Sequence, residues 1–141
     1  MVRASSAWLS RTIGTRVRVQ LDLAGHPVRV VADYAELERI VTNLVLNARD
    51  AVQTGEGMLH ISTGVRAEGA RLTVSDTGLG LTAEAKARMF EPYFTTKEHG
   101  TGLGLSGVAA TVSRLGGAVF VDSEPGHGTR VTVVIPLAST V

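Results

Sequence analysis

The sequence predicts an α/β fold: a two-layer sandwich with a mixed, mostly antiparallel sheet of five or six strands and three main helices on one face. Two observations lead to this prediction. Segments with the period of a strand mostly follow one another, which favours hairpins over regular alternation of strands and helices. One long segment and two shorter ones have the period of a helix. The 141 residues are enough for one compact domain with its own core.

The composition excludes several classes of protein. Hydrophobic residues make up 44% and charged residues 19% of the chain, as in an ordinary globular domain. The net charge is +1 without a basic block, so we expect no nucleic-acid partner. The absence of cysteine excludes disulfides and fits a reducing compartment. No apolar run nears the ~20 residues that span a bilayer and no signal peptide is visible, so we expect a cytoplasmic domain, whether or not a parent protein is membrane-anchored.

The first part of the chain is expected to hold short elements. Residues 5–13 can form a short helix. Residues 16–23 alternate between polar and apolar side chains, which is typical of a half-buried strand. After a turn at 26–27, residues 28–31 predict a second short strand.

A long amphipathic helix follows. Asp33 and Glu36 have the spacing of a capping box, and the helix that begins there reaches about Gln53. At about 100° per residue its apolar side chains form one stripe. The stripe consists of Leu37, Ile40, Val41, Leu44, Ala48, Ala51 and Val52.

The second half of the chain predicts strands, two helices and a closing hairpin. We expect strands at 58–65 and 70–76, helices at 82–90 and 103–115 with a loop between them, and hairpin strands at 118–123 and 129–136.

One face of the long helix carries Asn43, Asn47 and Asp50. With Asn43 set at 0°, Asn47 falls at about 40° and Asp50 at about −20°. Their carboxamide and carboxylate oxygens suit a hard cation such as Mg²⁺. Arg49 falls on another side and is expected to face solvent. A polar helix face without a site is the alternative interpretation.

A second candidate site is Asp76, which continues the face of Leu72 and Val74 at the end of a predicted strand. Its carboxylate should therefore point toward buried territory, where it needs hydrogen-bond donors. The exocyclic amine of adenine could donate to it, whereas guanine carries an acceptor at the same position. Gly78 and Gly80 follow, and an ordinary strand-to-turn Asp-Gly is the alternative.

Three further segments complete the set. In residues 90–97, Phe90 and Phe94 can anchor the ends of a loop in the core, and the hydroxyls and ammonium group of this loop can reach phosphate oxygens. Residues 100–105 open a helix with alternating glycines, whose amides can converge on an anion, and no Gly-Lys-Ser/Thr of a P-loop follows. Residues 126–129 form a hairpin turn with a hydroxyl at the start of the next strand.

Taken in this order, the five segments resemble the catalytic, ATP-binding domain of two-component histidine kinases, in the GHKL superfamily. The resemblance covers the chain from about Arg16 onward. Each motif is weak alone, and their joint order and spacing carry the resemblance. It implies the Bergerat fold, with ATP and Mg²⁺ held between the long helix and a lid. In the terms of that family, the N, G1, F, G2 and final glycine boxes correspond to residues 43–50, 76–80, 90–97, 100–105 and 126–129.

The resemblance also implies roles for single residues. Asn47 is expected to bind Mg²⁺, and Asp76 to accept a hydrogen bond from the adenine amine. Gly78 and Gly80 would permit close backbone approach around the base, and Thr129 would support Asp76 or the base. Asn43, Asn47 and Lys97 form the expected catalytic set. The other expected nucleotide contacts are Asp50, Phe94, Thr95, Thr96, Lys97, Gly100, Thr101, Gly102, Leu103, Gly104 and Leu105.

Two departures from the family pattern qualify these roles. Many relatives carry Lys-Tyr where this chain has Asp50-Ala51, so neither a phosphate-binding cation from the helix nor an aromatic stack on the base is expected. Lys97 then takes more of the phosphate charge. Only Glu98 and His99 separate Lys97 from Gly100, so we expect no large ordering of the lid on ATP binding.

Asn43 separates a kinase from a hydrolase. Related gyrase-type ATPases, and in this respect anti-sigma serine kinases, carry a water-activating glutamate at this position, and an amide cannot act as a base. The resemblance therefore implies transfer of the γ-phosphate to a histidine on a dimerising helix hairpin of the same or a partner kinase, with a response regulator downstream. A GHKL-type ATPase, a serine kinase and a non-catalytic nucleotide-sensing module are the alternatives.

The phosphoacceptor itself is not found in this sequence. His26, His60, His99 and His127 lie in a turn, a strand, the lid and a hairpin, and none has the acceptor's context. We expect residues 1–14 to be the remnant of a linker from a preceding dimerisation domain and residues 15–141 to be the catalytic domain. Because dimerisation in this family belongs to the helix hairpin, the isolated domain is expected to be monomeric.

Overall fold

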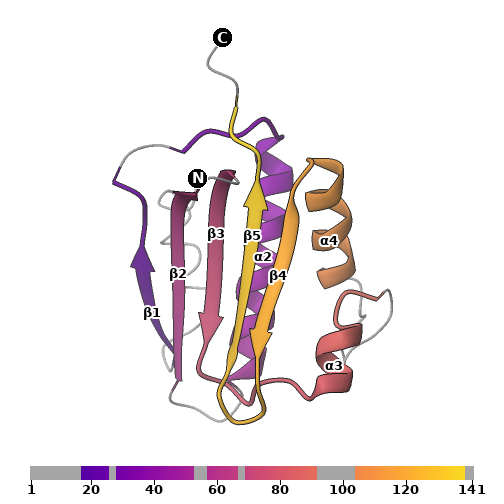
Figure 1. The fold of residues 1–141 in the computed structure, drawn as a ribbon. Coiled ribbons are helices and arrows are strands. Elements are labelled where there is room, and N and C mark those ends of the chain that lie inside the picture. The colour runs from indigo at the N-terminus through magenta and orange to yellow at the C-terminus, as the bar shows by residue number, and fades with distance from the viewer. Residues whose placement is uncertain (1–16, 26–27, 53–56, 67–68, 92–103, 139–141) are drawn as a thin grey trace.

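The structure is a computed structural model of the chain that describes residues 17–25, 28–52, 57–66, 69–91 and 104–138. Within these residues a single five-stranded sheet has the order β1-β2-β3-β5-β4 (Figure 1). β1 pairs with β2 in parallel, and the other pairs are antiparallel, so the predicted mixed and mostly antiparallel sheet is confirmed. The strands are β1 (Val17–Asp22), β2 (Gly57–Arg66), β3 (Gly69–Asp76), β4 (Ala118–Ser123) and β5 (Thr129–Ile135).

In the described part of the chain, three helices cover one face of this sheet, as expected for a two-layer sandwich (Figure 1). They are α2 (Tyr34–Ala51), α3 (Ala83–Arg88) and α4 (Gly104–Arg114). The expected short helix at residues 5–13 lies outside the described residues. No helix in the described part of the chain is long and apolar enough to cross a membrane.

The core lies between the helices and the inner face of the sheet. Strand residues of period two and helix residues of period 3.6 meet there, and both patterns are visible in the sequence. Burial of these side chains is the main force that holds the two layers together. The most buried members are Leu44, Val45, Leu59, Ile61, Val74, Val108, Val112 and Val133.

The predicted strand at residues 28–31 is wrong. Val30 forms only one isolated antiparallel bridge, with Leu137, and the amide of Ala138 donates to the carbonyl of Arg29 at 2.8 Å. α2 begins only four residues after Val30, which leaves no room for a longer strand. The segment therefore forms this single bridge with the chain after β5 and does not extend the sheet. Within the described residues the sheet therefore has five of the expected five or six strands.

The start of α2 differs from the predicted capping box. Asp33 is the N-cap residue, but its side chain makes no capping hydrogen bond. The side chain of Glu36, which a capping box would turn back on the N-cap amide, pairs instead with Arg114 at the end of α4. A tertiary ion pair has therefore replaced the local contact that the spacing predicts.

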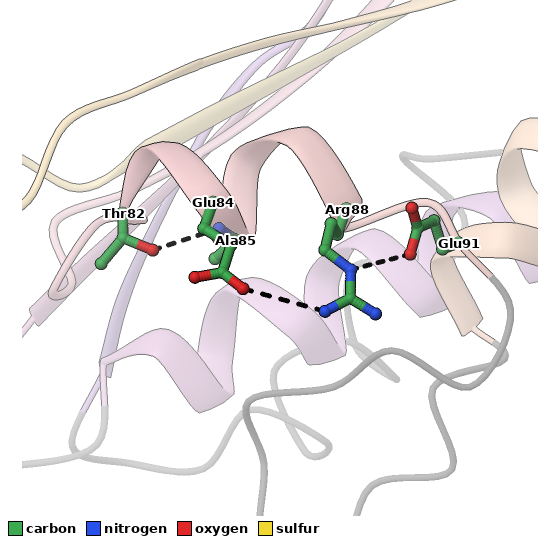
Figure 2. A network of polar contacts seen from close by, with 5 residues as sticks. All are labelled: Thr82, Glu84, Ala85, Arg88 and Glu91. Carbon is green, nitrogen blue, oxygen red and sulfur yellow. Dashed lines mark hydrogen bonds and ion pairs between the residues drawn. The ribbon is translucent and has the colours of Figure 1, made fainter.

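α3 has the side-chain cap that α2 lacks. The Thr82 hydroxyl accepts a hydrogen bond from the amide of Ala85 at 3.1 Å (Figure 2). Arg88 in the last turn pairs with Glu91 at 2.9 Å and more loosely with Glu84 at 3.9 Å. These local contacts stabilise a helix of only six residues, which is too short to be stable by backbone hydrogen bonds alone.

Candidate functional site

The most unusual buried group in the described chain is the carboxylate of Asp76, the last residue of β3. Its side chain lies on the inner face with Val74, and the residue is only 8% exposed. The amide of Gly78 donates to Asp76 Oδ1 at 2.9 Å, and the amide of Thr129 also donates to the carboxylate. Burial raises the pKa of Asp76 above the ordinary 3.8, and the two amide donors offset part of that rise. The expected inward orientation of Asp76 is what the structure has.

Thr129, the first residue of β5, lies directly opposite Asp76 in the β3–β5 register. It is 7% exposed, so its hydroxyl and the Asp76 carboxylate are both buried on the inner face at the same end of the sheet. The contact that supports Asp76 comes from the Thr129 backbone amide. The Thr129 hydroxyl lies 2.9 Å from the hydroxyl of Ser123.

The glycines around Asp76 are required by contacts between protein backbones. A Cβ atom at Gly78 would collide with the carbonyl of Ala51 at the end of α2. A Cβ atom at Gly80 would collide with the carbonyl of Glu124, and one at Gly128 with the carbonyl of Asp76 itself. The sequence led us to expect close approach to a base at Gly78 and Gly80, and the approach that the structure contains is to the protein's own backbone.

The turn after β3 is attached to the end of α2 and to the β4–β5 hairpin. The amide of Leu79 donates to the carbonyl of Ala51 at 3.3 Å, and the amide of Gly126 donates to the carbonyl of Leu79 at 2.6 Å. The end of β3 therefore lies beside the end of α2 and the start of β5 (Figure 1), and Asp76 is the last residue of β3.

α2 carries the other predicted site residues in its second half, from Asn43 near the middle of the helix to Asp50 in the last turn. Asn43, Asn47 and Asp50 are all partly buried, as expected for a helix face at the rim of the core. The Asn43 side-chain amide donates to the carbonyl of Gly104 at 3.3 Å, so it contacts the first residue of α4. The hydrogen bond from the amide of Leu79 to the carbonyl of Ala51 brings the end of α2, with Asp50, close to the turn that follows Asp76.

The helical angle predicts that Arg49 faces solvent, but in the structure its side chain is partly buried and contacts Asp50. Its guanidinium donates to Asp50 Oδ1 from Nε at 3.3 Å and from Nη2 at 3.2 Å. Only about a third of each side chain is exposed. Neighbouring residues on a helix do not usually face each other, and here the long arginine side chain reaches round to the carboxylate at the rim.

Most of the expected phosphate-binding residues lie outside the described part of the chain. They are Phe94, Thr95, Thr96, Lys97, Gly100, Thr101, Gly102 and Leu103. Gly104 and Leu105 are the first residues of α4, where Gly104 is exposed and Leu105 packs against the core.

Among the described residues of the expected site, Asn47 could provide an oxygen ligand to a metal ion. In this part of the chain no three His, Cys, Asp or Glu side chains gather into a metal site. Mg²⁺ usually keeps several waters and substrate phosphates and needs only one or two protein oxygens. The Asn47 side chain can supply one such oxygen from α2.

Sequence reasoning missed Ser123, the last residue of β4. Its hydroxyl contacts Leu81, Gly128 and Thr129, all within 2.9 Å. The signal was present, because the alternation of the strand at 118–123 places Ser123 on the same face as Val119 and Val121. Ser123 is a polar side chain at the end of an inward-facing row, as Asp76 is in β3, and this position indicates a buried polar contact.

Comparison with known proteins identifies a family model that covers most of the chain. Residues 32–139 match the model described as histidine kinase-, DNA gyrase B-, and HSP90-like ATPase. Sensor kinase CckA of Brucella abortus is 35% identical over 144 residues, which cover 91% of this chain and 15% of that protein. Sensor histidine kinase RcsC of Escherichia coli is 40% identical over 119 residues, which cover 79% of this chain and 12% of that protein. The chain therefore spans only a small part of these relatives.

Solved structures of the same class have the same fold. The mycobacterial sensor histidine kinase MprB superposes with a TM-score of 0.84 at 25% identity, covering 99% of this chain and 95% of that one. The catalytic domain of histidine kinase ThkA superposes with a TM-score of 0.77 at 29% identity, covering 95% and 86%. Full-length ShkA, solved in complex with AMPPNP, has a TM-score of 0.79 at 28% identity, and the match covers 99% of this chain and 29% of ShkA.

Proposed function

Because the chain belongs to the family of histidine kinase-, DNA gyrase B- and HSP90-like ATPases, we propose that it binds Mg²⁺-ATP and donates the γ-phosphate to a histidine of a phosphoacceptor helix hairpin. The hairpin would belong to the same or a partner kinase, and a response regulator would take the phosphate next. The relatives named sensor kinases, and the ShkA structure with a nucleotide analogue, support this proposal.

The observation that carries the proposal is the buried Asp76 carboxylate. A buried carboxylate is costly unless it has donors, and two backbone amides already hold this one in place. The exocyclic amine of adenine could donate a further hydrogen bond to this carboxylate. Asp76 would therefore select adenine over guanine by accepting from the amine.

The remaining roles follow from the resemblance of the motifs to those of the family. Asn47 would hold Mg²⁺, which when bound neutralises charge on the phosphates. Asp50, Lys97 and the segment from Phe94 to Leu105 would surround the phosphates, with Gly104 and Leu105 at the start of α4. Catalysis at such a site consists of positioning and charge neutralisation.

Asn43 favours transfer over hydrolysis. A hydrolase of this family needs a base to activate water, and a carboxamide cannot take a proton at neutral pH. Its side-chain amide instead donates to the carbonyl of Gly104. We therefore assign Asn43 a role in holding the start of α4 beside α2.

Nucleotide binding is tested by calorimetric titration of ATP and GTP into the wild-type chain and Asp76→Asn. We expect wild type to prefer ATP, and Asp76→Asn to bind ATP roughly ten- to a hundredfold more weakly, the usual effect of losing a hydrogen bond to a charged group. Asp122→Asn, at an exposed aspartate on the outer face of β4, is the control and should bind like wild type. Equal affinities for both nucleotides in wild type and Asp76→Asn would contradict the proposal.

Phosphoryl transfer is tested by mixing the chain with γ-labelled ATP and a cognate helix-hairpin domain. We expect the label on the hairpin, and none when its acceptor histidine is replaced. Label recovered only as free phosphate would contradict the transfer and favour a hydrolase.

A further inference from the structure

Ser123 makes three hydrogen bonds at the site and belongs to none of the motifs. Its Oγ accepts from the amide of Leu81 at 2.8 Å and lies 2.9 Å from the carbonyl of Gly128. It also lies 2.9 Å from the Thr129 hydroxyl, where either oxygen could be the donor by distance alone. These contacts join the turn after β3, the β4–β5 hairpin and the residue opposite Asp76.

The hydrogen atoms decide the direction of the third contact. A serine hydroxyl has one hydrogen and two lone pairs. The Gly128 carbonyl cannot donate, so the Ser123 hydrogen points to it, and the Leu81 amide cannot accept, so it occupies one lone pair. The second lone pair must then receive the hydrogen of Thr129. All three positions of the Ser123 hydroxyl are used.

Thr129 is thereby fixed as an acceptor toward any ligand. Its only hydroxyl hydrogen is engaged by Ser123, so Oγ1 offers lone pairs alone. The Asp76 carboxylate, directly opposite in the β3–β5 register, is also an acceptor. Both residues are more than nine-tenths buried, where water cannot easily substitute for a mismatched partner. The Thr129 hydroxyl oxygen and the Asp76 carboxylate can therefore both accept hydrogen bonds from an amino group of a ligand. A carbonyl oxygen at the same place would meet two acceptors and no donor.

We propose that Ser123 is a positioning residue for base selectivity: by accepting the Thr129 hydroxyl hydrogen it keeps Thr129 an acceptor beside Asp76, so that the site admits an amino-purine and rejects an oxo-purine. The inference rests on the proposed function, since it concerns the base of the same nucleotide. Ser123 acts through Thr129 and does not itself touch the base.

The test compares ATP with inosine triphosphate, whose base carries an oxygen where adenine has the amine. Calorimetry of the full chain gives the ratio of the two dissociation constants. Wild type should bind ATP more tightly. In Ser123→Ala the Thr129 hydroxyl turns and donates to the inosine oxygen, so the preference for ATP should fall by roughly three- to tenfold, the value of one hydrogen bond.

Two further variants separate this role from a loss of structure. In the Thr129→Val background, adding Ser123→Ala should leave the ratio unchanged, because the hydroxyl that Ser123 orients is gone. Ser75→Ala is the matched control, since Ser75 is a partly buried serine next to Asp76 on the opposite face of the sheet. It should retain the wild-type ratio. The ratio of the two dissociation constants does not depend on how much of the protein is folded. A destabilised Ser123→Ala variant therefore still shows whether the preference for ATP has changed.

The outcomes distinguish this inference from the proposed function. A wild-type chain that binds neither nucleotide contradicts nucleotide binding itself. A wild-type chain that prefers ATP, together with an unchanged ratio in Ser123→Ala, overturns the inference and leaves the function intact. Equal affinities in wild type, or additive effects of Ser123→Ala and Thr129→Val on the ratio, also overturn it.

Discussion

At the scale of single residues, the buried carboxylate of Asp76 lowers the stability of the folded chain. Burial penalises the charged form, and the amides of Gly78 and Thr129 only partly compensate. The folded chain thus holds a carboxylate in a place that an apolar side chain would fill at lower cost. We interpret this as a position kept ready for a donor from a ligand.

The raised pKa of Asp76 predicts a pH dependence of stability. The folded state binds this proton more tightly than the unfolded state does, so the contribution is largest below the ordinary 3.8 and is lost as pH rises through the raised pKa. Relative to the non-titrating Asp76→Asn, wild type should therefore lose free energy of unfolding as pH rises from 4 to 7.

Urea unfolding at several pH values measures this difference. Since the cause is desolvation and not a charge pair, the trend should persist at high salt, which screens exposed charges. A difference that is constant over this range, or that favours wild type as pH rises, would contradict the assignment.

At the scale of elements, α4 is tied to α2 near both of its ends. The Asn43 amide contacts Gly104 at the start of α4, and Glu36 pairs with Arg114 at its end. Arg114 is largely exposed, so the ion pair contributes at most about 1 kcal/mol. The burial of Val108 and Val112 must therefore provide most of the free energy that holds α4 on the fold. The two polar contacts set the position of α4 along α2.

The β4–β5 hairpin offers a matched pair of glycine substitutions. Gly126 and Gly128 have nearly equal positive φ angles, 82° and 78°. Around Gly126 there is space for a Cβ atom, whereas at Gly128 it would strike the carbonyl of Asp76. Gly126→Ala should cost about 1–2 kcal/mol for the left-handed backbone alone. Gly128→Ala should cost about 3 kcal/mol or more, because overpacking adds to that strain.

Thermal or urea unfolding of the two variants measures the difference. Gly126→Ala serves as the control for the backbone conformation. Equal losses of stability would mean that the approach of Gly128 to the strand of Asp76 is not tight in solution.

At the scale of the whole molecule, the strand order predicts where the fold is most resistant to opening. β3 lies in the middle of the sheet and β5 is paired on both sides, whereas β1 and β4 are edge strands. In an edge strand about half of the backbone groups lack a partner strand. We expect amide hydrogen exchange to be slowest in β3 and β5 and clearly faster in β1.

Exchange followed by NMR or mass spectrometry checks this order, with the short, exposed helix α3 as a fast-exchanging reference. Amides of β1 as well protected as those of β3 would show that the parallel edge strand is a full member of the stable core.

The sequence by itself determined most of the helices and strands and which of their side chains face the core. Period-two alternation placed Asp76 on the inner face, helical angles put Asn43 and Asn47 together, and the glycine pairs marked the ends of helices and the hairpin. These features could be predicted because they depend on neighbours a few residues away and on which side chains avoid water.

Only the tertiary structure decided which elements meet. It paired β1 with β2 in parallel, reduced residues 28–31 to a single bridge, and drew Glu36 away from its local cap to Arg114. It also brought Ser123 to Thr129 and placed the Thr129 amide on Asp76. Hydrogen bonds of this kind join residues far apart in the chain or depend on strand register, and no local period reveals them.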